Sequence, residues 1–267
     1  MRSLIDSRLK YIVIPLAILA AATLVLPLLA LVIRTPFSSF FDQLGQDRVR
    51  DALRVTAITS SVTTLFAIVL GVPLAAVLAA TKGPLTTALR AIATVPMVLP
   101  PVAGGIALVS LLGRRGVLGS TLDDQLGITL LGTPAGVVIA QLFVSLPFLV
   151  VAVEAGFHSI NVRQLDAAAT LGASPLQRWR LVGLPMLRPA LVAGATLTWA
   201  RAVGELGATI TFAGSLPGQS RTVPTEVLLL IETDPGAANV LSVVLLIVSA
   251  GVLIGLRGRW LGRIATP

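Results

Sequence analysis

The chain has 267 residues, 55% of them apolar and only 12% charged, with a mean hydropathy of +0.93. Because a soluble domain carries about a quarter charged residues, this composition excludes an ordinary soluble domain and indicates a polytopic membrane protein. The lack of cysteine excludes disulfides and thiolate metal sites, and the single histidine, His158, is too little to build a zinc or haem centre. The net charge of +8 comes from 20 Lys and Arg against 12 Asp and Glu. In a membrane protein we take this excess as a guide to orientation and expect no nucleic-acid partner.

Six apolar stretches are long enough to cross a membrane, which takes about 20 helical residues. In chain order they lie near residues 11–33, 55–81, 91–112, 133–157, 190–212 and 237–256. The third contains Pro100-Pro101, where a span can kink, and the fifth contains Arg201 and Glu205. No internal repeat of solenoid period is visible. We therefore predict an all-α polytopic membrane protein of six transmembrane helices, with residues 1–267 forming one membrane domain.

The positive charges give an orientation. Six spans place both termini on one side of the membrane, and twelve Lys and Arg residues then lie on that side against seven on the other. The twelve are Arg2, Arg8, Lys10, Lys82, Arg90, Arg163, Arg178, Arg180, Arg188, Arg257, Arg259 and Arg263, and the seven are Arg34, Arg48, Arg50, Arg54, Arg114, Arg115 and Arg221. Since cytoplasmic loops carry an excess of Lys and Arg, we predict that both termini and the loop at 158–188 are cytoplasmic.

The cytoplasmic loop at 158–188 carries the signals of two short helices. Asn161 is a typical N-cap with Gln164 three residues on, as in a capping box, and Gly172 is a typical helix end because glycine accepts a left-handed backbone. Ser174 and Pro175 then restart a helix, as N-cap and first-turn residue, and Gln177 again lies three residues after the cap, as in a capping box. Pro185 disfavours helical geometry in the residue before it, so we expect the second helix to end there. The loop is thus predicted to be a rigid helix–turn–helix.

Two roles fit such a loop on physical grounds. It contains Arg178, Trp179 and Arg180, which suit a helix lying at the membrane interface. It also has alanines at 167 to 169, whose narrow profile suits insertion into a groove of a cytosolic partner. The residue types leave both roles open.

The segment DAAATLGASPLQRWRLVGLP, residues 166–185, resembles the EAA loop of ABC importer permeases. That pattern reads E-A-A, three residues, G, nine residues, I, one residue, L-P. The spacing is kept throughout, with aspartate for glutamate and valine for isoleucine, and the matching positions are Asp166, Ala167, Ala168, Gly172, Val182, Leu184 and Pro185. The resemblance implies that this loop couples the spans to ABC ATPase subunits in the cytosol. Neither Lys10 nor Lys82 follows G-x-x-x-x-G, so we expect no P-loop, no enzymatic activity and no cofactor in this chain, with ATP bound by the partner subunit.

Two further stretches resemble molybdate and tungstate permeases. The first, WARAVGELGATITFAGSLPGQSRTVPTEV, spans residues 199–227 and includes Arg201, Gly204, Glu205 and Gly207 at matching places, and the second, VLPPVAGGIALVSLLGRRGVLG, spans residues 98–119. Sulfate permeases share a close variant of the first stretch. The resemblance implies a multi-pass subunit of a prokaryotic cell membrane importer for a tetrahedral oxyanion, molybdate or tungstate, with sulfate as the alternative. It also implies an extracytoplasmic oxyanion-binding protein and a second permease copy as partners.

Arg201 and Glu205 are the charged residues of the expected fifth span. They are four residues apart, hence on one face of a helix, and intramembrane charges are by default candidates for function. One reading makes them, with Gly204 and Gly207, part of the translocation path or its gate, and the other makes them a structural ion pair. Direct coordination of the anion by Arg201 is disfavoured because Glu205 neutralises it. In an ion-coupled secondary transporter, the rival class, the pair would be a relay, although such carriers often show internal repeats.

Overall fold

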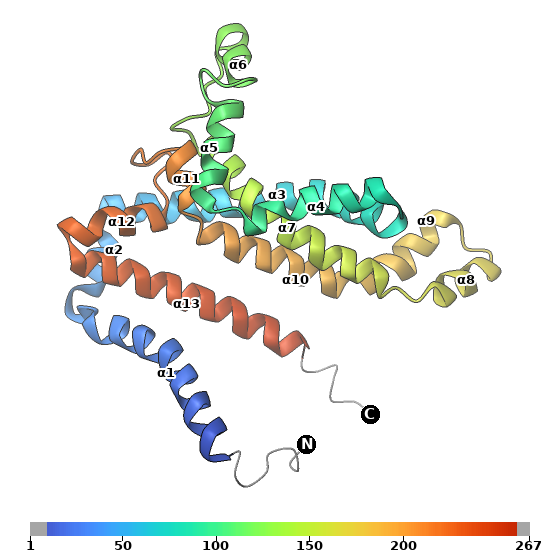
Figure 1. Cartoon of the computed structure of the whole chain (residues 1–267), viewed down its shortest axis with the longest axis horizontal. Helices are drawn as coiled ribbons and strands as arrows, with labels where there is room; N and C mark the ends of the chain where they lie inside the picture. Colours follow the sequence, from blue (N-terminus) through green and yellow to red (C-terminus); the bar gives the residue numbers. More distant parts are fainter. Residues whose placement is uncertain (1–9, 261–267) are drawn as a thin grey trace.

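The computed structural model describes residues 10–260, which are helical or lie in short connections, with no strand in that range. Four long helices run side by side along the molecule, namely α3 (Asp47–Ala80), α7 (Pro134–His158), α10 (Leu184–Val203) and α13 (Pro235–Trp260) (Figure 1). Helix α7 packs against both α3 and α10. The core between these three helices is made of small and branched side chains: Ala67, Ala75, Leu78, Leu149, Val150, Val153 and Leu187.

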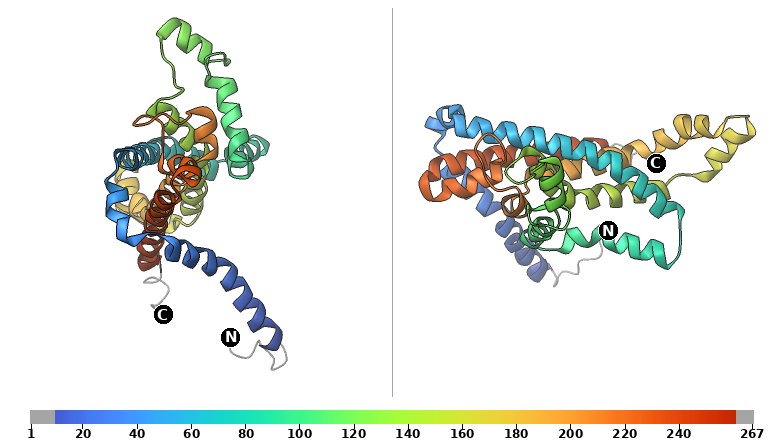
Figure 2. Two further views of the ribbon diagram at one scale, coloured as in Figure 1. Left: turned by 90° about the vertical axis from the view of Figure 1, so that its left-hand side faces the viewer. Right: turned by 90° about the horizontal axis from the view of Figure 1, so that it is seen from above.

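The other elements lie around and beyond this bundle. They are α1 (Lys10–Arg34), η1 (Phe37–Ser39), α2 (Phe40–Gly45), α4 (Pro84–Val98), α5 (Pro101–Leu112), α6 (Gly119–Leu126), α8 (Val162–Thr170), α9 (Pro175–Arg178), η2 (Trp179–Gly183), α11 (Gly207–Phe212) and α12 (Val223–Thr233). Helix α1 diverges from the bundle on one side, and α5 and α6 extend from it on another (Figure 2). None of the apolar window of α1 is buried inside the chain.

The helices have the length and apolar character of membrane spans. Five helices of the described part qualify, and the bent pair α4–α5 raises the number to six when it is counted as one span. They expose many large apolar side chains, such as Leu24 at 72% and Leu65 at 61%, which lipid covers and water would not. The prediction of an all-α polytopic membrane protein is confirmed.

The expected third span, 91–112, is interrupted. Helix α4 ends at Val98, α5 begins at Pro101, and the two helices are bent by 117°. Leu99 and Pro100 have extended backbones at the break, as expected when each precedes a proline. The consecutive prolines therefore cause a sharp break and turn α5 away from the direction of the bundle (Figure 1).

The expected fifth span, 190–212, also differs from the structure. A continuous helical run of 29 residues, Pro175–Val203, is formed by α9, η2 and α10, and it stops before Gly204. The expected helix end before Pro185 is wrong. Element η2 is a π-helical turn in which the Leu184 N–H donates to the Trp179 carbonyl five residues earlier. Pro185 therefore lies in the first turn of α10, where its missing N–H is tolerated.

The two ends of the bundle differ. Helices α8 and α9 form one end, while α2 and α12 lie at the other, and α13 runs from the α12 end back toward the end with α8 and α9 (Figure 1). Three of the cations used for the orientation, Arg2, Arg8 and Arg263, lie outside the described residues.

Candidate coupling loop and helix break

The first arm of the coupling loop, residues 158–188, is helix α8. The Asn161 side chain accepts a hydrogen bond from the Arg163 N–H at 3.1 Å and so caps the helix, but the expected capping box with Gln164 is not formed. The helix carries Asp166, Ala167 and Ala168. It is followed by Gly172 at φ +84°, a left-handed backbone that glycine adopts without strain. The turn that joins the two arms thus depends on the residue type at position 172.

The second arm begins with a complete capping box. The Gln177 N–H donates to Ser174 Oγ at 3.4 Å, and the Ser174 N–H donates to Gln177 Oε1 at 2.8 Å. The arm then continues through Val182 into Leu184 and Pro185, so these three matched residues lie at the base of a membrane span. Helix α8 packs back against α9 and η2.

The tip of the coupling loop is apolar. Leu171 is 88% exposed and Leu176 is 62% exposed, and the hairpin extends beyond the end of the bundle along the direction of the spans (Figure 1). An interfacial helix lies in the plane of the membrane instead. Exposed apolar side chains of this kind mark a surface that contacts a protein or a membrane. The sequence match did not include these two leucines, because the EAA pattern leaves their positions open.

The second candidate site is the helix break that follows α10. Gly204, Glu205 and Leu206 separate α10 from α11. Glu205 Oε2 lies 2.5 Å from Arg201 Nη1, and Glu205 Oε1 accepts a hydrogen bond of 2.8 Å from the Ala208 N–H. The two residues were expected on one helical face, whereas Glu205 lies beyond the end of α10. Its carboxylate instead joins the last turn of α10 to the first turn of α11.

Burial makes this junction costly to disturb. The Glu205 side chain is 1% exposed and that of Arg201 is 28% exposed. Helix α11 begins against the start of α5, where Gly207 packs on Pro101. The break between α4 and α5 therefore meets the break between α10 and α11. Irregular backbone at membrane depth is tolerated only where protein buries it or where it lines a water-filled cavity.

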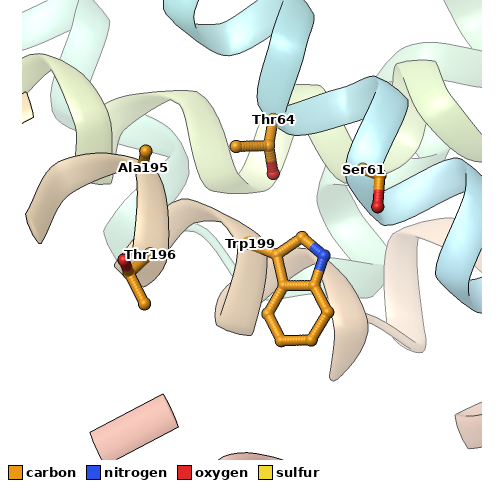
Figure 3. Close-up of a pocket in the computed structure, with 5 residues that line it drawn as sticks. All are labelled: Ser61, Thr64, Ala195, Thr196 and Trp199. Atoms are coloured by element: carbon orange, nitrogen blue, oxygen red, sulfur yellow. The ribbon is translucent and has the colours of Figure 1, made fainter. Parts of the chain in front are cut away.

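A hollow lies between α3 and α10, and its lining residue Trp199 is two residues before Arg201 in the chain. It is lined by Ser61, Thr64, Ala195, Thr196 and Trp199 (Figure 3). Its three hydroxyls each donate to a carbonyl of their own helix, at 2.7 to 2.8 Å. An oxyanion only accepts hydrogen bonds, so hydroxyls oriented in this way do not offer it donors.

Among the ion pairs that sequence reasoning did not find are Arg90–Glu154 and Arg221–Glu226. Arg90 on α4 donates to Glu154 on α7 at 2.6 Å and also to the Leu78 carbonyl on α3 at 3.2 Å. Near the opposite end, Arg221 lies 3.3 Å from Glu226, whose side chain is 2% exposed. The partners of the first pair are 64 residues apart, so no local spacing indicates that they meet.

Membrane-length helices with a helical hairpin at one end are the architecture of a transporter's membrane component. The chain belongs to the family of binding-protein-dependent transport system inner membrane components, whose model matches residues 67–263.

Individual relatives agree with the family. The chain is 41% identical over 250 residues to the molybdenum transport system permease protein ModB of Mycobacterium tuberculosis, covering 94% of each chain. It is 33% identical over 237 residues to the sulfate transport system permease protein CysT of Salmonella typhimurium, covering 87% of this chain and 85% of the relative. A bacterial alginate ABC transporter, bound to a pentasaccharide-loaded periplasmic protein, has the same fold in one chain, with a TM-score of 0.74, 17% identity and coverage of 94% and 93%.

Family membership places the chain in its system. It is a multi-pass protein of the inner membrane and not the catalytic subunit, and ATP is used by a separate ATPase in such systems. Its system includes an ATPase and a binding protein. These findings exclude the ion-coupled secondary transporter that the intramembrane charges had left open.

Proposed function

We propose that this chain is the molybdate-conducting permease of an ATP-driven importer. The observation that carries the proposal is the 41% identity to a molybdenum permease over 94% of both chains. The chain receives molybdate, or tungstate of the same shape and charge, from an extracytoplasmic oxyanion-binding protein.

In the proposed assembly two copies of the chain form the pore and each carries one coupling loop. The loop docks on an ATPase subunit through α8 and the turn at Gly172, and both termini are cytoplasmic. The excess of cations on the loop side, twelve against seven, supports this orientation. So does the course of α13, which returns toward the end that carries α8 and α9.

The proposed gate is the junction of Arg201, Gly204, Glu205 and Gly207. A helix break with a buried ion pair at the end of a span supports this role, because both features are costly in a membrane and are typical of transport pathways. Arg201 is neutralised by Glu205, so the pair holds α10 to α11 and does not bind the anion itself.

Sulfate is the second candidate cargo, and the 33% identity to a sulfate permease favours it. Molybdate and sulfate are both tetrahedral dianions, so the fold and the ion pair serve either. The higher identity and the wider coverage both support molybdate.

Loss of the chain from its host cell tests the cargo. We expect a deletion strain to lose molybdenum-enzyme activity when molybdate is scarce and to regain it when molybdate is abundant, since other routes then suffice. Growth with sulfate as the only sulfur source should stay normal. A strain that keeps its molybdenum enzymes but needs another sulfur source would show that the cargo is sulfate.

A further inference from the structure

The two ends of the coupling loop are joined by an aromatic contact. Phe157, in the last turn of α7, stacks on Trp179 with ring centroids 5.9 Å apart and an interplanar angle of 14°. Phe157 also packs against the core cluster of α3, α7 and α10. Trp179 is the residue at which α9 passes into the π-helical turn η2. A path of side-chain contacts thus connects the second arm of the coupling loop to the core of the bundle.

Gly183, at the end of the π-helical turn, has no side chain, and the Trp179 ring occupies the space that this leaves. A Cβ added at Gly183 would lie 2.6 Å from Trp179 Cε3, so the ring rests directly on the glycine backbone. The carbonyl of Trp179 accepts the hydrogen bond from the Leu184 N–H that closes the turn. π-Helical turns are rare and are frequent at functional sites. We call Phe157, Trp179 and Gly183 together the aromatic joint.

We propose that Trp179 is a positioning residue for ATP-driven transport, because the aromatic joint makes the coupling loop and the pair α7–α10 move as one body. The inference rests on the proposed function, in which an ATPase moves this loop. Between residues 158 and 178 the loop is held by its own caps, at Asn161 and Ser174. Its second arm continues into α10, whereas its first arm is joined to α7 only through the non-helical residues 159–161. Stacking of Trp179 on Phe157 fixes the end of α7 to the second arm at the base of the loop.

Vesicles containing the permease with its ATPase and binding protein test the joint. We expect Trp179→Leu to bind the ATPase and to hydrolyse ATP, while molybdate taken up per ATP falls about 2- to 10-fold, the factor that corresponds to the loss of one aromatic pair. Trp179→Phe keeps a ring on Phe157 and should restore the ratio. Phe40→Leu is the matched control, because Phe40 stacks on Phe37 with centroids 6.0 Å apart at the other end of the molecule, and it should leave the ratio unchanged.

Gly183→Ala separates the joint from general damage to the helix. Its methyl group displaces the Trp179 ring, so alone it should lower the ratio as Trp179→Leu does. Combined with Trp179→Leu it should add little, because the ring is already gone. A wild-type ratio in Trp179→Leu, or equal harm from Gly183→Ala with and without the ring, would overturn the inference.

A distance measurement that needs no molybdate tests the aromatic joint independently of the proposed function. The chain has no cysteine, so two cysteines introduced at Gln164 on α8 and Val192 on α10 are the only sites that a spin label attaches to. Distances between the two labels should fall in one narrow range in the wild type and spread in Trp179→Leu. An unchanged distribution would refute the joint, whereas absent molybdate uptake in wild-type vesicles would refute only the cargo.

Discussion

Arg201→Met is expected to abolish assembly of the permease in the membrane. The substitution leaves the Glu205 carboxylate, which is 1% exposed, without its cation, and removing one partner of a buried pair costs about 3–5 kcal/mol. This is a large part of the total stability of a typical domain. Detergent extracts should therefore contain little folded protein, which size-exclusion chromatography measures.

The double variant distinguishes a gate from a scaffold. Arg201→Met with Glu205→Gln removes both charges and retains an acceptor for the Ala208 N–H. We expect it to assemble well and yet to transport poorly or to leak, because the junction then lacks the bond that holds α10 to α11.

Arg221 and Glu226 are the matched control, with side chains 22% and 2% exposed. Arg221→Met with Glu226→Gln should leave the ATP-driven uptake per assembled molecule unchanged. Intact ATP-driven uptake in the Arg201–Glu205 double variant would reduce that pair to a structural role.

Gly172→Val is expected to be inserted normally but to lose ATP-driven uptake. A left-handed backbone costs about 1–2 kcal/mol in a non-glycine residue and more with a branched side chain. No atom lies within 4 Å of the position of an added Cβ, so the backbone angle of +84° is the only obstacle. Relief of the strain changes the turn and moves α8 away from α9. Co-purification with the ATPase and uptake with ATP measure the effect.

Two controls isolate the turn. Gly172→Asn should retain most uptake, because asparagine tolerates the left-handed region better than other non-glycine residues do. Gly127→Val introduces similar strain, at φ +63° and also in open space, but at the end of α6. It should leave ATPase binding intact. Normal uptake in Gly172→Val would contradict the role of the turn in coupling.

The local features of the coupling loop were predictable from the sequence because they depend on neighbours in the chain. The cap at Asn161, the capping box at Ser174 and the turn at Gly172 each involve residues no more than five positions apart. The fate of Pro185 was not predictable in this way. A proline ends a helix or begins one according to the hydrogen bonds of the preceding turn, and those were set by the π-helical turn at η2.

The interrupted spans show a second limit. Hydropathy registers apolar length, and residues 91–112 and 190–212 are both long enough, so each was expected to be one span. A helix breaks where its backbone N–H and C=O groups find hydrogen-bond partners other than those of the regular helix. Glu205 supplies one by accepting from the Ala208 N–H, and α5 finds its packing surface on α11, about a hundred residues further along the chain. Such contacts exist only in three dimensions.

Uptake by reconstituted vesicles tests the central claim, that this chain conducts molybdate at the expense of ATP used elsewhere. The purified chain is combined with its ATPase and binding protein, and molybdate inside the vesicles is followed with and without ATP. We predict accumulation that requires all three proteins and ATP, that tungstate reduces and that excess sulfate leaves unchanged. Accumulation of sulfate in preference to molybdate, or molybdate entry that continues without ATP, would contradict it.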